Sequence, residues 1–239
     1  MSEPTRILEG AALDLTYAPA QWPFALEQAA AIDKHWAKCV AEKPALFNGR
    51  ALLCAEHSFR DDGQGRTVLR GAYIAAEYKA FLAWRDFGFP DRGVCNCFSM
   101  AALQSADGAF LLGEMSSGTA SAGAIYFAAG TPDFSDVFGD RVDLAASVTR
   151  ELAEETGLSP DEVIQAPDWT IIEAAPRIAC MKLMRLAMSA DAAKARIDAF
   201  LAADPKAELA RIHIVWSVAD IDEARMPGFV AAYLRHILG

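Results

Sequence analysis

The chain has 239 residues, enough to bury one large core or two modest ones. Its content of 53% hydrophobic and 23% charged residues is that of an ordinary globular protein, and no apolar run reaches the length of a membrane span. A net charge of −10 argues against binding long nucleic acids, whose affinity depends on cationic contacts to phosphates. We therefore expect neither a long nucleic acid nor a membrane as partner.

The first ninety residues alternate between strand and helix patterns and predict a small α+β unit. Asn48-Gly49, between two short apolar runs, is typical of a two-residue hairpin turn. The loop at 88–93 contains two glycines and a proline and breaks the pattern. We place a boundary there, between an N-terminal subdomain (1–92) and a larger domain (93–239). The elements expected before it are strands at 7–17 and 67–73 and helices at 24–43 and about 75–87.

The larger domain continues the alternation. Strands are expected at 94–103, 109–114, 124–128 and 211–218, an extended stretch at 169–188, and helices at about 144–156, at 190–203 and from Pro227 onward. Strands interleaved with helices predict the α/β (α+β) class, a mixed sheet sandwiched by helices.

Cysteines and histidines give no metal signature. The five cysteines are an odd number without paired spacing, and Cys95 and Cys97 suit one face of a strand better than a zinc knuckle. The four histidines likewise lack metal-ligand spacing. The N-terminus lacks the basic start and apolar core of a secretory signal. Reduced, buried thiols in a cytoplasmic protein are therefore expected.

Residues 150–158, Arg-Glu-Leu-Ala-Glu-Glu-Thr-Gly-Leu, carry the strongest functional pattern. Glu151, Glu154 and Glu155 stand at i, i+3 and i+4, so on a helix they share one face. Such like charges repel unless a cation compensates them. Mg²⁺ and Mn²⁺ prefer oxygen ligands, and such ions usually work with substrate phosphates. The alternative is an ordinary solvated helix face with an Arg150–Glu154 ion pair.

This segment resembles the second half of the Nudix box, and it matches at every fixed position from Arg150 to Leu158. The first half departs from the pattern, whose glycine and glutamate would fall on Asp136 and Val142. The loop opens instead with Gly-Thr-Pro-Asp at 130–133. Asp143 is expected to cap the helix and to replace the missing glutamate as the partner of Arg150.

The resemblance implies a Nudix sandwich fold and metal-dependent hydrolysis of a diphosphate, with Mg²⁺ or Mn²⁺ as cofactor. It implies that Glu151, Glu154 and Glu155 are metal ligands, with the Gly130 carbonyl as a weaker one. Either Glu154 or Glu155 would act as the base, and Arg150 would orient the cluster. A homodimer is the default expectation for the family.

Substrate hints come from a looser resemblance to Nudix proteins that hydrolyse UDP-glucose and UDP-galactose. It rests on short segments at 44–49, 69–71 and 78–82 and on the Gly-Thr-Pro-Asp opening. It implies cleavage of a nucleoside diphosphate sugar to a nucleoside monophosphate and a sugar 1-phosphate. ADP-ribose, a dinucleotide or coenzyme A are alternative substrates, and a non-catalytic nucleotide-sensing domain is the alternative function. Arg70 is a candidate substrate contact from the N-terminal subdomain, with an ordinary salt bridge as the alternative.

Overall fold

The computed structural model describes residues 5–239, which form six α-helices and thirteen strands. The strands are β1 (Arg6–Tyr17), β2 (Arg50–Asp61), β3 (Thr67–Glu77), β4 (Asn96–Gln104), β5 (Phe110–Met115), β6 (Ile125–Tyr126), β7 (Ala129–Gly130), β8 (Val137–Phe138), β9 (Arg141–Val142), β10 (Val163–Gln165), β11 (Trp169–Ala174), β12 (Arg177–Leu186) and β13 (Leu209–Val215). The helices are α1 (Pro23–Glu27), α2 (Ala29–Glu42), α3 (Tyr78–Asp86), α4 (Leu144–Thr156), α5 (Ala190–Ala203) and α6 (Gly228–Leu238), and three 3-10 turns are η1 (Phe134–Asp136), η2 (Pro160–Glu162) and η3 (Val218–Asp220). Within this part of the chain, no helix is long and apolar enough to cross a bilayer.

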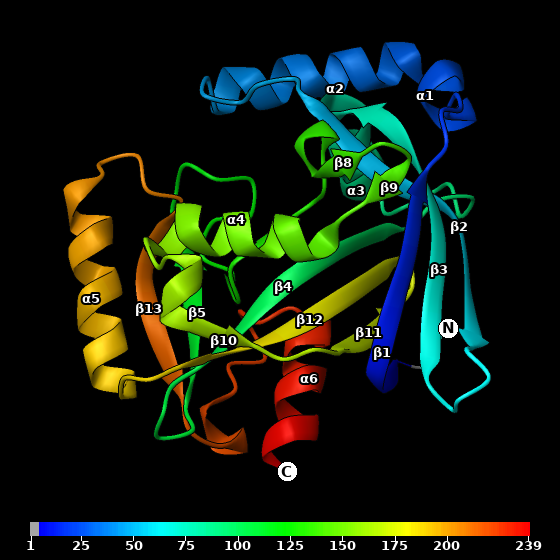
Figure 1. Ribbon diagram of the computed structural model, residues 1–239. Coiled ribbons are helices and arrows are strands. Elements are labelled where there is room, and N and C mark those ends of the chain that lie inside the picture. The colour runs from blue at the N-terminus through cyan, green and yellow to red at the C-terminus, as the bar shows by residue number, and fades with distance from the viewer. Residues whose placement is uncertain (1–4) are drawn as a thin grey trace.

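The strands form one mixed sheet in the order β13-β5-β4-β12-β11-β1-β3-β2 (Figure 1). The pairs β4–β12 and β1–β3 are parallel, and the other neighbours in this order are antiparallel. This arrangement of a large mixed sheet with helices confirms the predicted α/β class.

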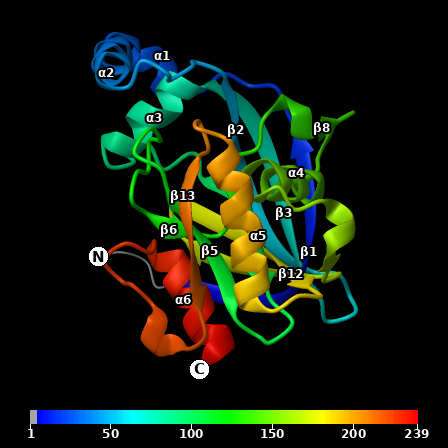
Figure 2. The ribbon, with the colours of Figure 1, turned by 90° about the vertical axis from the view of Figure 1, so that its left-hand side faces the viewer.

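The central strand β4 is buried on both faces, as expected where helices cover both sides of a sheet. Ala101 and Leu103 belong to the core that includes residues of α4 and α5, whereas Met100 and Ala102 belong to the core that includes residues of α6. Figure 2, seen from the β13 edge, shows α4 and α6 on opposite sides of the sheet.

A third core joins α1, α2 and α3 to the β2–β3 hairpin through Trp22, Leu53, Ile74 and Trp84. Strand β1 pairs with β3 on one side and with β11 on the other, so strands from before and after the 88–93 loop hydrogen-bond within one sheet. The division of the chain into 1–92 and 93–239 stays a prediction.

The predicted hairpin at Asn48-Gly49 is wrong. These residues precede β2, whose hairpin partner is β3, and residues 62–66 connect the two strands. The Asn48 side-chain oxygen accepts a hydrogen bond of 2.9 Å from the backbone N–H of Lys79, in the first turn of α3. A tertiary contact therefore uses the asparagine that seemed suited to a local turn.

Other predicted boundaries shift by a few residues. Helix α3 begins only at Tyr78, because Ala75 and Ala76 pair with β2 in the sheet. The expected helix at 24–43 divides into α1 and α2 at Gln28, and β13 ends at Val215. In each case pairing or packing overrides a local preference.

Candidate active site

Helix α4 is fixed at both ends by its own sequence. The Asp143 carboxylate accepts hydrogen bonds from the backbone N–H groups of Ala145 and Ala146 at 2.9 and 3.0 Å, which confirms the predicted N-cap. At the other end Gly157 adopts the left-handed conformation, with φ of 70°, and its N–H bonds to Ala153. The apolar face of α4 is buried against the sheet, so its glutamates keep a fixed orientation.

Glu151 and Glu155 point inward from α4 toward β7. The Glu151 carboxylate lies against Gly130, where an added Cβ would stand 2.1 Å from Oε1 of Glu151, so only glycine allows this approach. Glu155 is 5% exposed, and its Oε1 accepts a 3.5 Å hydrogen bond from the N–H of Ala129. Its other oxygen, Oε2, is buried without a hydrogen-bond partner. A buried polar atom without a partner is costly, so this oxygen is a candidate ligand atom for a cation.

Glu154 lies at the solvent edge of the group. Its side chain is 61% exposed and forms an i,i+4 ion pair of 3.2 Å with Arg150, as the alternative interpretation of this helix had it. In the described residues, the acidic triad of α4 is not among the sets of three potential ligands whose atoms all lie within 4.8 Å of one another. The structure thus brings Glu151 and Glu155 inward and leaves Glu154 outward, because the helix turns Glu154 toward solvent.

Arg150 is held by Asp136, and the predicted partner, Asp143, is wrong because that carboxylate is occupied as the helix cap. Nη2 of Arg150 lies 3.2 Å from both carboxylate oxygens of Asp136, and Nη1 lies 2.8 Å from Glu151. Asp136 is 1% exposed and also accepts from the N–H of Asp133 in a reciprocal cap of η1. The pattern Asp-x-x-Asp in the loop is the sequence feature that could have revealed this turn.

The two inward carboxyl groups hold protons unusually tightly. Burial raises the pKa of Glu151 to about 7, and the charge of Glu154 adds to this, while Arg150 opposes it. Burial, followed by the charges of Glu151 and Glu208, raises the pKa of Glu155 well above its ordinary value. A cation between these groups would relieve both the desolvation and the repulsion.

Glu208 is a fourth carboxylate at this site, and sequence reasoning missed it. It directly precedes β13, and its backbone oxygen accepts a 2.7 Å bond from Ser116. Its charge contributes to the raised pKa of both Glu151 and Glu155. No local pattern marks it, because more than fifty residues separate it from α4 and only the sheet brings it near.

The donor set fits a hard divalent cation. It consists of carboxylate oxygens only, one of them buried without a partner, which suits Mg²⁺ or Mn²⁺ rather than a metal that prefers sulfur. Glu151 and Glu155 are the inward candidates for ligands, with Glu154 and Glu208 at the margin. Gly130, the weaker candidate ligand, lies directly against Glu151.

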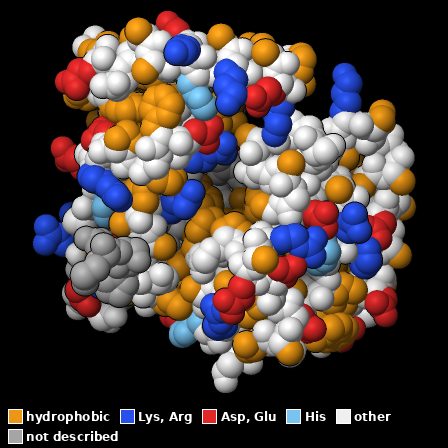
Figure 3. Space-filling view, turned by 180° about the vertical axis from the view of Figure 1, so that it is seen from behind, with side chains coloured by type: hydrophobic (Ala, Val, Ile, Leu, Met, Phe, Trp, Pro, Cys, Tyr) orange, Lys and Arg blue, Asp and Glu red, His pale blue; other side chains and the backbone are white. Residues whose placement is uncertain are grey.

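Arg85 and Arg177 are neighbouring arginines, and Arg85 lies near Tyr126. Burial and then the charge of Glu155 raise the pKa of the Tyr126 hydroxyl, while the charge of Arg85 lowers it, so Tyr126 lies near both. Burial and the charge of Arg85 lower the pKa of Arg177, whose guanidinium carbon lies 4.7 Å from the ring centre of Phe89. Within residues 5–239 Arg177 forms no ion pair, although Arg85 pairs with its neighbour Asp86. Seen from behind, the protein is hollowed near its centre, where basic side chains border hydrophobic ones (Figure 3).

Arg70 lies on β3 and forms a 3.2 Å ion pair with Asp14, which also binds Arg141 at 2.6 Å. Its side chain is largely exposed, and among the described residues no contact joins it to the glutamates of α4. Its role as a substrate contact stays a prediction.

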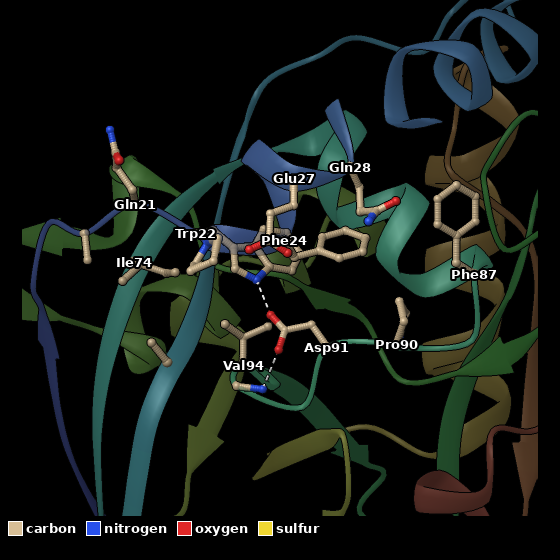
Figure 4. Close-up of a pocket in the computed structure, with 14 residues that line it drawn as sticks. Gln21, Trp22, Phe24, Glu27, Gln28, Ile74, Phe87, Pro90, Asp91 and Val94 are labelled. Atoms are coloured by element: carbon tan, nitrogen blue, oxygen red, sulfur yellow. Dashed lines mark hydrogen bonds between the residues drawn. The ribbon is translucent and has the colours of Figure 1, made fainter. Parts of the chain in front are cut away.

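A separate aromatic cavity of about 670 Å³ lies beside α1 and the 87–94 segment (Figure 4). Trp22 donates a 2.6 Å hydrogen bond from Nε1 to Asp91, whose other oxygen accepts from the N–H of Gly93. Phe24 and Phe87 also line it. None of its lining residues belongs to α4 or β7, so it is distinct from the carboxylate site.

Comparison with known proteins finds distant likeness among solved structures. No family model and no curated protein matches the sequence. Among solved structures, a Nudix hydrolase from M. smegmatis aligns over 59% of this chain and 81% of its own, with 12% identity and a TM-score of 0.38. A NUDIX hydrolase from Nitrosomonas europaea aligns over 60% of this chain and 89% of its own, with 18% identity and a TM-score of 0.38. The MutT protein from Methanosarcina mazei aligns over 59% of this chain and 90% of its own, with 14% identity and a TM-score of 0.35. Likeness at this level carries no argument about activity, so the function must be argued from the site.

Proposed function

We propose that this protein is a hydrolase of the Nudix type that uses Mg²⁺ or Mn²⁺ to cleave the diphosphate of a nucleoside diphosphate derivative. The observation that carries the proposal is the buried, unpartnered Oε2 of Glu155, which lies on the same helix face as Glu151. A purely structural glutamate at this depth would have its oxygens hydrogen-bonded, whereas a cation ligand keeps one free.

In this proposal, residues of the chain bind the cation and orient its ligands. Glu151 and Glu155 hold the cation, and Gly130 gives Glu151 the room to reach it. Arg150, anchored on Asp136, fixes the orientation of Glu151 through their 2.8 Å ion pair. A bound divalent cation would neutralise substrate phosphates and acidify a water molecule.

Glu154 is the residue we assign as general base. Its carboxylate keeps access to solvent, so it can accept a proton from the attacking water, whereas Glu155 is committed to the cation. Glu155 is the alternative base. Glu154→Gln should lower kcat while leaving the metal concentration for half-maximal activity unchanged, and Glu155→Gln should raise that concentration.

Arg85 and Arg177 are the residues we assign to the substrate diphosphate. They are neighbouring cations, Arg85 lies near Tyr126 as Glu155 does, and Arg177 has no acidic partner in the described chain. Arg177, unpaired among the described residues and next to a second guanidinium group, favours an anion such as a diphosphate. Arg177→Gln should raise KM by about 10- to 100-fold, corresponding to about 1.4–2.8 kcal/mol. Arg235→Gln, on α6 and paired with Glu223, is the matched control and should leave KM unchanged.

The substrate we place first is a UDP-glucose-like nucleoside diphosphate sugar, giving a nucleoside monophosphate and a sugar 1-phosphate. This choice rests on the resemblance of the segments at 44–49, 69–71 and 78–82 and of the loop opening at 130–133. ADP-ribose, dinucleotides and coenzyme A belong in the same assay.

The deciding experiment incubates purified protein and Mg²⁺ with these substrates and identifies the products by mass spectrometry. Glu155→Gln should reduce turnover by orders of magnitude with the fold retained, and Glu162→Gln, whose carboxylate pairs with Arg196 on the surface, should not. Absence of any product, combined with nucleotide binding that Glu155→Gln leaves intact, would exclude the enzyme and establish the nucleotide-sensing alternative.

A further inference from the structure

A second cluster of potential metal ligands lies away from α4, in the N-terminal half of the sheet. The ligand atoms of Cys54, His57 and Cys95 all lie within 4.8 Å of one another. Cys54 and Cys95 form an isolated antiparallel bridge, with reciprocal backbone hydrogen bonds of 3.0 and 2.8 Å. Both cysteines are buried, and both are free thiols.

A backbone irregularity brings His57 to this cluster. In a regular strand, residues 54 and 57 point to opposite faces because side chains alternate. The register of β2 against β3 shifts between Cys54 and Glu56, which is the signature of a β-bulge. The extra residue restores Cys54 and His57 to the same face, a known use of bulges in redirecting side chains.

The spacing has the size of a tetrahedral metal site. Sγ of Cys95 lies 3.8 Å from Nδ1 of His57. With Zn–S near 2.3 Å and Zn–N near 2.0 Å, two ligands on a tetrahedral zinc ion are separated by about 3.6 Å for sulfur and nitrogen and about 3.8 Å for two sulfurs. The three side chains therefore need only small adjustments to surround one ion.

The other ring nitrogen of His57 faces a carboxylate, the kind of group that commonly orients a metal-bound imidazole. Nε2 lies 3.6 Å from a carboxylate oxygen of Glu173 on β11. A carboxylate in this place orients the ring and leaves Nδ1 free to bind a metal.

In the group of His35, Cys39 and Asp86, by contrast, the histidine does not use one ring nitrogen for the thiol and the other for the carboxylate. There the same nitrogen, Nε2, faces both Asp86 at 2.9 Å and Cys39 at 3.4 Å. Ordinary hydrogen bonds explain that group.

A disulfide between Cys54 and Cys95 is disfavoured by the same backbone geometry. Directly opposed residues in an antiparallel pair have Cβ atoms about 4.5–5.5 Å apart, and a hydrogen-bonded pair such as this one lies toward the wider end. A disulfide needs Cβ atoms within about 3.5–4.5 Å, whereas a bridging ion tolerates the wider separation.

We propose that Cys54, His57 and Cys95 form a zinc site, with water as the fourth ligand and Glu173 as the residue that positions His57. Sulfur and imidazole ligands suit Zn²⁺ and exclude Mg²⁺, so this site is chemically distinct from the carboxylate site on α4. His57 and Gly71 also border an open hollow of about 370 Å³, so the His57 side of the cluster is open to solvent. The ion cross-links residues 54 and 95 and stabilises the junction of β2 with the segment before β4.

Cobalt(II) titration of the chelator-treated, reduced full-length protein tests the proposal. One equivalent should produce the near-ultraviolet absorption of cobalt bound to thiolate, together with the visible bands of tetrahedral cobalt, and Zn²⁺ should abolish both. Mg²⁺ should not compete. Cobalt held by the glutamates of α4 would give no thiolate absorption, which separates the two sites.

Variants locate the site. Cys95→Ser and His57→Asn should each weaken cobalt binding by at least about 10-fold, in line with the loss of a ligand. Cys180→Ser and Cys39→Ser each remove a thiol elsewhere and should have no effect. His57 is partly exposed, so His57→Asn retains the fold even if Cys95→Ser does not.

Three results would overturn the proposal. The first is the absence of thiolate–cobalt absorption in the wild-type protein. The second is an absorption that survives His57→Asn and Cys95→Ser alike. The third is a Cys54–Cys95 disulfide in freshly purified protein, detected by mass spectrometry without reduction.

Discussion

Glu151→Gln should stabilise the metal-free protein at alkaline pH while it abolishes activity. Burial raises the pKa of Glu151 from 4.5 to about 7 in the folded protein. Below about pH 4.5 the carboxyl group is protonated in both states and carries no penalty. Between about pH 4.5 and pH 7 the unfolded chain releases the proton and the folded chain keeps it, so stability falls as the pH rises. Above pH 7 the loss is complete.

The size of the effect follows from the same pKa values. At 1.36 kcal/mol per pH unit, the rise from 4.5 to about 7 corresponds to about 3 kcal/mol. Glutamine keeps the shape of the side chain and does not titrate. It also loses the ion pair with Arg150, but Arg150 retains Asp136 as a partner. We therefore expect a net gain of about 1–3 kcal/mol at about pH 8.5 and less than about 1 kcal/mol at about pH 5.

Urea unfolding of chelator-treated wild-type and variant proteins at these two pH values measures the difference. Added Mg²⁺ should raise the free energy of unfolding of the wild type and have little effect on the variant, because a ligand is missing. Glu154→Gln is the comparison: it removes one charge that raises the pKa of Glu151 but leaves the buried carboxyl group in place, so most of the pH dependence of stability should remain. A variant that is less stable than the wild type at about pH 8.5, or that differs equally at both pH values, would refute the reasoning.

Three further substitutions test the geometry of the site. Gly130→Ala should reduce activity by at least about 10-fold with the fold retained, because its Cβ would stand 2.1 Å from the Glu151 carboxylate; steady-state kinetics against Mg²⁺ concentration measures this. Asp136→Asn should lower both kcat and the free energy of unfolding, the latter by about 1–3 kcal/mol in urea unfolding, because it leaves Arg150 without its buried charged partner. Gly157→Ala should lower the free energy of unfolding by about 2 kcal/mol or more, also measured in urea, because φ is 70° there and its Cβ would stand 2.4 Å from a ring carbon of the Phe200 side chain.

Matched glycines provide the controls. Gly118→Ala meets no atom within 4 Å and should leave activity unchanged. Gly139 has φ of 65° with open space around it, so Gly139→Ala isolates backbone strain from the clash at Gly157. Equal destabilisation at both positions would contradict the steric contribution of Phe200. An active Gly130→Ala protein would show that the Glu151 carboxylate is not confined there.

The sequence by itself determined the local parts of this protein. The Asp143 cap, the glycine that ends α4 and the apolar face of this helix all follow from spacings within a few turns. Helix α5 likewise begins after its Ser189 cap and ends at the predicted residue. Such features depend on neighbours along the chain, so a single sequence contains the information.

Only the tertiary structure decided which distant groups meet. Asn48 binds α3 instead of forming a hairpin, Asp136 replaces Asp143 as the partner of Arg150, and Glu208 joins the glutamates of α4 from the start of β13. The ligand group of Cys54, His57 and Cys95 depends on strand pairing between distant segments and on one extra residue in β2. Strand register and bulges are set by the packing of the whole sheet, so no local spacing could predict these contacts.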